Sequence, residues 1–184
     1  MSRFGLVAEG EYDVPALKKL IQMIAGHSVE VIDRPCHGDG NVIKLFPSLL
    51  YELGSETTLD KALVVRDLGH YTPGRLRKIM QKRMPDGGYS FPVKFVVIVR
   101  ELEAWLLADE KAIAQVTGVE VKTFKNPEKI KNPKERLQEI LSKASPPIPY
   151  TPSVAMDIAE NARISILVKR CSSFKEFRRA VLDC

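Results

Sequence analysis

Four short, mostly apolar runs alternate with longer stretches of helical periodicity over the first hundred residues. Runs this short and rich in Val, Ile and Leu predict strands that are buried on both faces, as in parallel sheets. The segments between them repeat apolar residues every three or four positions, which predicts helices. The order βαβαβαβ predicts an α/β fold with a compact, mainly parallel sheet of about four strands and flanking helices. The predicted strands are Arg3 to Ala8, Ser28 to Arg34, Ala62 to Arg66 and Val93 to Val99.

Capping and helix-breaking residues set the expected limits of the first helices. Asp13 is predicted to cap a helix that ends at Gly26. The second helix is expected to end at Gly54, and Pro47 inside it predicts a kink or a late start. The polar turn before it, CHGDGN at 36–41, lacks the lysine and the Ser or Thr of a phosphate-binding loop, which excludes a P-loop NTPase.

From Glu101 onward only helices are expected. The predicted helical segments are 101–109, 110–116, 133–144 and 173–182. The proline-rich stretch 145–153 is predicted to be an extended linker. Without a repeat or a break in composition, we expect one domain, with an α/β core over 1–109 and a helical extension over 110–184.

Composition narrows the class of protein. The chain has 184 residues of which 45% are hydrophobic, and no apolar run approaches the ~20 residues that cross a bilayer. The N-terminal MSRFGLVAEGEYD turns acidic too early for a signal peptide, so a cytoplasmic protein away from membranes is expected. Three widely spaced cysteines predict free thiols, and the lack of a CxxC pair argues against zinc.

Acidic residues follow three of the four predicted strands. Glu9, Asp67 and the pair Glu101 and Glu103 come at or just past a strand end. Since parallel strands end at one edge of the sheet, these carboxylates are expected to converge there, where they repel one another unless protons or cations intervene. The pattern predicts a Mg²⁺ or Mn²⁺ site, with Asp13 in support. Taken singly, each acid is also typical of a turn or of the first turn of a helix.

The basic residues allow two interpretations. The net charge is +5, and Arg75, Lys78 and Lys82 are predicted to line the outer face of one helix. Such a stripe is typical of a surface that binds phosphates of nucleic acid, and equally of an ordinary solvated helix face.

Several segments resemble a known family. EGEYD at 9–13, VVRD at 64–67 and especially RELEAWLLAD at 100–109 resemble small Toprim-like proteins of unknown function. These are relatives of the OLD-type nucleases, which often accompany AAA ATPases in phage-defence operons. NPEKIKNPKERL and SSFKEFRRAVL extend the resemblance to nearly the whole chain. The resemblance implies a Toprim-like fold and a Mg²⁺-type site built on Glu9 and Asp67.

One position departs from the Toprim pattern. Gly69 stands where a full motif has a second aspartate, and the neighbouring side chain able to coordinate an ion or act as a base is His70. The implied catalytic residues are therefore Glu9, Asp67 and His70. Two functions are open: a metal-dependent nuclease acting in phage defence, or a non-catalytic binding or regulatory partner. The expected partners are nucleic acid (DNA or RNA) and an AAA ATPase, with a homodimer as an open alternative.

Overall fold

The computed structural model describes residues 2–36 and 41–183, so most of the predicted turn at 36–41 lies outside the described residues. It shows an α/β fold whose sheet has the strand order β2-β1-β3-β4 with every pair parallel. The predicted fold class is confirmed, and each predicted strand is present within two residues of its expected ends. The strands are β1 (Arg3–Ala8), β2 (Glu30–Pro35), β3 (Lys61–Asp67) and β4 (Val93–Ile98).

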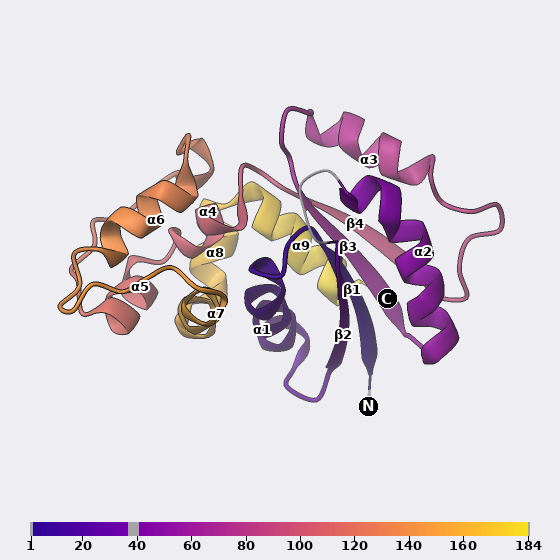
Figure 1. Ribbon diagram of the computed structural model, residues 1–184, viewed down its shortest axis with the longest axis horizontal. Helices are drawn as coiled ribbons and strands as arrows, with labels where there is room; N and C mark the ends of the chain where they lie inside the picture. The colour runs from indigo at the N-terminus through magenta and orange to yellow at the C-terminus, as the bar shows by residue number, and fades with distance from the viewer. Residues whose placement is uncertain (1, 37–40, 184) are drawn as a thin grey trace.

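Both faces of the sheet are buried because side chains alternate along each strand. In β3, Leu63 and Val65 belong to the apolar cluster on one face, whereas Ala62 and Val64 belong to the cluster on the other. The helices α1 (Asp13–Ala25) and α9 (Ser172–Leu182) cover the first face, and α2 (Asn41–Glu56) and α3 (Pro73–Gln81) cover the second (Figure 1).

Two predicted helix limits were wrong. Asp13 is the first helical residue and not the cap, because Tyr12 already has helical angles (φ −68°, ψ −31°) and makes no side-chain cap bond. Gly54 lies inside α2, which continues through Pro47 to Glu56. A Cβ atom on Gly54 would come within 2.8 Å of the Phe91 ring, so the glycine permits close packing and does not end the helix.

The region after β4 is helical, as predicted, and two of its helices were not anticipated. These are α7 (Pro152–Asn161) and α8 (Ile164–Arg170). Pro152 and Ser153 form the first turn of α7, where proline's fixed φ is tolerated, so the extended segment is shorter than predicted. No helix in the described part of the chain is long and apolar enough to span a membrane. The remaining elements are α4 (Leu102–Leu106), α5 (Glu110–Thr117), the 3₁₀ turn η1 (Pro127–Lys129) and α6 (Pro133–Leu141).

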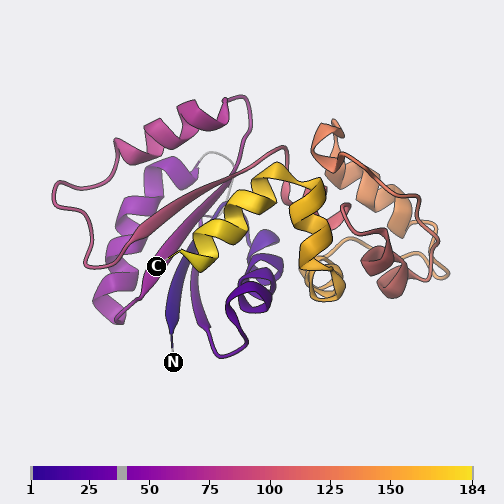
Figure 2. The same ribbon diagram turned by 180° about the vertical axis from the view of Figure 1, so that it is seen from behind.

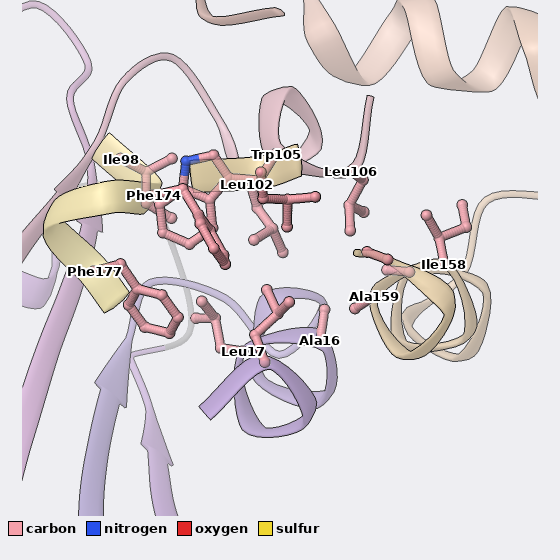
Figure 3. Packing of buried hydrophobic residues seen from close by; sticks show 14 of the residues in the cluster. Ala16, Leu17, Ile98, Leu102, Trp105, Leu106, Ile158, Ala159, Phe174 and Phe177 are labelled. Carbon is pink, nitrogen blue, oxygen red and sulfur yellow. The ribbon is translucent and has the colours of Figure 1, made fainter. Parts of the chain in front are cut away.

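One apolar cluster extends from the sheet into the helical region. Trp105 of α4 is fully buried, and its ring centroid lies 5.1 Å from each of Phe174 and Phe177 of α9. Figure 3 shows these rings above Leu17 of α1, with α7 alongside. The Trp105 indole donates a hydrogen bond of 2.8 Å to Ser173 Oγ, so its polar atom is satisfied. Trp105 therefore anchors the core.

Charged side chains hold both ends of α9, which crosses one face of the sheet (Figure 2). The Glu128 carboxylate accepts hydrogen bonds from the backbone N–H groups of Ser172 (2.8 Å) and Ser173 (2.9 Å). At the other end, the buried Lys61 ammonium donates to the carbonyls of Val181 (2.9 Å) and Asp183. Both charges have the sign that the helix dipole favours.

Candidate functional site

Five carboxylates meet at the carboxyl edge of the sheet, in a cleft of about 300 Å³ that we call the acidic cleft. Three of them come from strand ends: Glu9 follows β1, Asp67 is the last residue of β3, and Glu101 follows β4. The other two lie in the first turns of helices that begin nearby. The cleft is lined by Glu9, Asp13, Asp67, Glu101 and Glu103, together with Gly10, Tyr12 and Lys134.

Glu9 is held between β1 and β3. Its Oε2 accepts a hydrogen bond of 3.3 Å from the backbone N–H of Asp67, and its Oε1 lies 4.0 Å from Arg66 Nε. Only 13% of the Glu9 side chain is exposed. The first strand therefore delivers a carboxylate whose direction is fixed by the neighbouring strand.

Burial and mutual repulsion raise the pKa values of three of these acids. Burial raises the pKa of Asp67 well above its ordinary range, and the charges of Asp13 and Glu9 add to it. The pKa of Asp13 rises to about 7, first through burial and then through repulsion by Glu103 and Glu9. Burial likewise raises the pKa of Glu103. The cleft therefore concentrates negative charge that protons or cations would relieve.

The helical region supplies one wall of the acidic cleft. The backbone N–H of Lys134 in α6 donates to Glu101 Oε2 at 3.2 Å, and its ammonium lies 5.6 Å from the Tyr12 ring centroid and 5.9 Å from that of Tyr150. The Tyr150 hydroxyl forms a hydrogen bond with Glu103, and the charge of Lys134 lowers the pKa of that acid. Residues far apart in the sequence thus complete the site.

A second cleft of about 400 Å³ adjoins the first and shares three of its carboxylates; we call it the arginine cleft. The Arg66 side chain within it is 8% exposed. Arg100 has a left-handed backbone (φ +71°), which is unusual for a residue with a side chain. The lining residues are Glu9, Arg66, Asp67, Gly69, His70, Arg100 and Glu101.

Gly69 and His70, which follow Asp67 closely, differ from the second aspartate of a Toprim motif. Gly69 has φ +57°, a conformation that side chains other than glycine adopt at a cost, so the local backbone favours glycine there. His70 lines the arginine cleft and not the acidic cleft, and it is exposed with its ring centroid 4.2 Å from that of Tyr71. The role of His70 as a base or ligand stays a prediction.

The donor set suits a hard cation, but its arrangement is not that of a formed metal centre. Carboxylate oxygens are the ligands that Mg²⁺ and Mn²⁺ prefer. Within residues 2–36 and 41–183, no group of three or more His, Cys, Asp or Glu side chains is placed so that it could hold an ion. The roles of Glu9, Asp67, Glu101, Glu103 and Asp13 as ligands therefore stay predictions.

The predicted basic stripe is exposed along α3 and lines neither cleft. Arg75, Lys78 and Lys82 all have exposed side chains. The stripe begins near the arginine cleft, because the Arg75 guanidinium lies 5.9 Å from the Tyr71 ring centroid and that of Arg66 lies 5.4 Å from it. Tyr71 thus links the first basic residue of α3 to the cleft.

Comparison with known families gives one result. Residues 65–182, more than half of the chain, match the family described as Domain of unknown function (DUF4276). The chain belongs to this family. No curated protein matches the chain, and neither does any solved structure. The DUF4276 region begins within β3, so it contains Asp67, Glu101 and Glu103 of the acidic cleft, whereas Glu9 and Asp13 precede it.

Within the DUF4276 region, one acid of the ELEAWLLAD segment has a structural role. Asp109 is fully buried and caps α5, and it accepts hydrogen bonds from Arg163 Nε (2.8 Å) and Nη2 (2.6 Å) and from the Arg163 backbone N–H (2.8 Å). Burial raises its pKa, but these hydrogen bonds outweigh that effect and hold the pKa below its ordinary value. This acid joins α5 to the start of α8 and does not line either cleft.

Arg66, Arg100 and Tyr150 were not identified from the sequence as residues of the two clefts. A charged residue at the end of an apolar, buried strand is unusual, so the position of Arg66 is a local signal for a site residue. Tyr150 carried none, since it stands in no motif and reaches the site through the packing of the helical region. Lys134 lies in the NPEKIKNPKERL segment and also reaches the site through that packing.

Proposed function

We propose that the protein is a Mg²⁺- or Mn²⁺-dependent, nuclease-like enzyme that acts on phosphodiesters of nucleic acid. The observation that carries the proposal is the adjacency of five carboxylates from three strand ends and two helices to a cleft that holds two arginines. Carboxylates suit a divalent cation, and guanidinium groups suit the phosphate on which it would act.

Each group has a distinct task in this proposal. Glu9, Asp67 and Glu101 would hold the ion, with Glu103 and Asp13 in support, after side-chain rotation brings their oxygens together. A divalent ion supplies Lewis acidity and a nucleophilic water at neutral pH. His70 is exposed to solvent at the edge of the arginine cleft, which suits a group that exchanges protons during the reaction.

The resemblance to Toprim-like proteins extends this proposal to partners. On that resemblance we propose a phage-defence effector that acts on DNA or RNA together with an AAA ATPase. The exposed stripe of Arg75, Lys78 and Lys82 would contact phosphates outside the cleft.

The test is cleavage of single- and double-stranded DNA and RNA with Mn²⁺, with and without the ATPase. Glu9→Gln removes a charge at nearly constant volume and should abolish cleavage, whereas Glu52→Gln on the exposed face of α2 should not. The proposal fails if no substrate is cut under any condition and Mn²⁺ does not raise the melting temperature.

A second function is favoured by one observation. Because the described carboxylates form no ready metal centre, the same surface would suit a non-catalytic partner of nucleic acid or of an ATPase. This alternative predicts nucleic-acid binding that persists in Glu9→Gln and needs no metal ion.

A further inference from the structure

Arg66 carries an unmet need for hydrogen-bond acceptors. Its Nε and Nη1 atoms are buried and have no hydrogen-bond partner, and no other buried side-chain nitrogen or oxygen in the described residues shares this condition. Leaving two buried guanidinium donors without acceptors is costly, because they lose hydrogen bonds to water without replacing them. Such a group in a native fold points to a partner that binds there.

The neighbours of Arg66 do not meet this need. Glu9 Oε1 lies 4.0 Å from Nε, which is too long for a hydrogen bond although it balances some charge. The Tyr71 ring, with its centroid 5.4 Å away, packs against the guanidinium and offers no strong acceptor. These two donors are buried, but they belong to a side chain that lines the arginine cleft.

We propose that Arg66, assisted by Arg100, forms an oxyanion subsite that binds a phosphate group of the substrate in the arginine cleft. A phosphate offers several oxygens to the planar donors of arginine and fits easily in a space of about 400 Å³. The assignment of this anion to a substrate phosphate rests on the proposed function, whereas the anion site itself rests on Arg66.

Three carboxylates line the same cleft, so the affinity for an anion there depends on whether a cation is also bound. Glu9, Asp67 and Glu101 repel an anion, and a divalent cation bound among them would offset most of that repulsion. Anion and cation therefore favour each other's binding, and the two effects are equal by thermodynamic linkage. Arg66 is the donor through which that coupling acts.

The experiment measures Mn²⁺ binding by electron paramagnetic resonance, with and without inorganic phosphate. In the wild-type protein phosphate should raise the apparent Mn²⁺ affinity by about tenfold, within the usual range of coupling between sites. Arg66→Lys keeps the charge but not the planar donors, and should reduce the effect below about twofold. Arg83→Lys, at an exposed position after α3, should leave it unchanged.

The outcomes separate this inference from the proposed function. Mn²⁺ binding with no phosphate effect, or with the same effect in Arg66→Lys, overturns the subsite and leaves the metal site in place. If Mn²⁺ does not bind, the metal-dependent function fails, and phosphate titration in chelator by ³¹P NMR decides the subsite: binding that Arg66→Lys removes supports it, and no binding overturns it. Should Arg66→Lys fail to fold, the exposed Arg100→Gln takes its place and should lower the coupling.

Discussion

Asp13→Asn should stabilise the ion-free protein in a manner that depends on pH. Burial, followed by repulsion from Glu103 and Glu9, raises the Asp13 pKa from 3.8 in a model peptide to about 7 in the fold. The folded state therefore binds the Asp13 proton more tightly than the unfolded state does. The contribution of Asp13 to the free energy of unfolding is most favourable below its unfolded pKa of about 4. It falls as the pH rises towards about 7, because ionisation of Asp13 is costly in the acidic cleft.

The size of the effect follows from the shift. About three pKa units correspond to roughly 4 kcal/mol as an upper limit, since each unit is worth about 1.4 kcal/mol. Asp13 is only partly buried, so screening by solvent reduces the expected gain to about 1–2 kcal/mol. Asparagine keeps the shape and carries no charge, so it removes this cost at high pH and changes little at low pH.

The assay is urea unfolding in chelator at about pH 5 and about pH 8, where the unfolding free energy of each variant is compared with that of the wild type. The gain from Asp13→Asn should be larger at the higher pH by about 1 kcal/mol, because part of the cost of ionisation is already present at pH 5. Asp86→Asn, in an exposed loop, should show no such difference. An equal gain at both pH values, or a loss at the higher one, would refute the electrostatic account of the acidic cleft.

Three other results are expected. Asp109→Asn keeps the helix cap but weakens the bond to Arg163, and should lower the unfolding free energy by about 1.5–3 kcal/mol near neutral pH. Because the Asp109 pKa is lowered in the fold, this loss should shrink only below about pH 4. Asp157→Asn in α7 is the control. Neutralising Arg75, Lys78 and Lys82 together should reduce the slope of log affinity for DNA against log salt by up to about three units, and an unchanged slope would mark a solvated face. Mn²⁺ should raise the melting temperature of the wild type but not of Glu9→Gln, and equal shifts in both would exclude Glu9 as a ligand.

The sheet could be predicted from the sequence because β1, β3 and β4 are separate, mostly apolar runs, and an acid ends or soon follows each of them. The same feature placed Glu9, Asp67 and Glu101 at one edge, since parallel strands share a direction. The helices α7 and α8 escaped prediction because they are short and follow a proline-rich segment whose composition indicates extended chain. Local sequence fixes the strands and leaves the path of the last third of the chain to tertiary packing.

The site residues also divide into those with a local sequence signal and those that only tertiary packing brings to the site. The carboxylates have a local signal because acids recur at the ends of three strands, whereas Tyr150 reaches Glu103 only through contacts between elements distant in sequence. Gly69 has a left-handed backbone, a conformation that glycine adopts without cost.

The position of Lys134 shows that neither part of the chain makes the site alone. The sheet provides acids that repel one another, and α6 brings a cation whose charge lowers the pKa of both Asp13 and Glu103. The same residue donates its backbone N–H to Glu101, so the docking of α6 and the charge balance of the acidic cleft are physically linked. A change that loosens α6 should therefore raise the repulsion among the carboxylates as well as remove apolar contacts. On this reasoning the helical region belongs to the site itself.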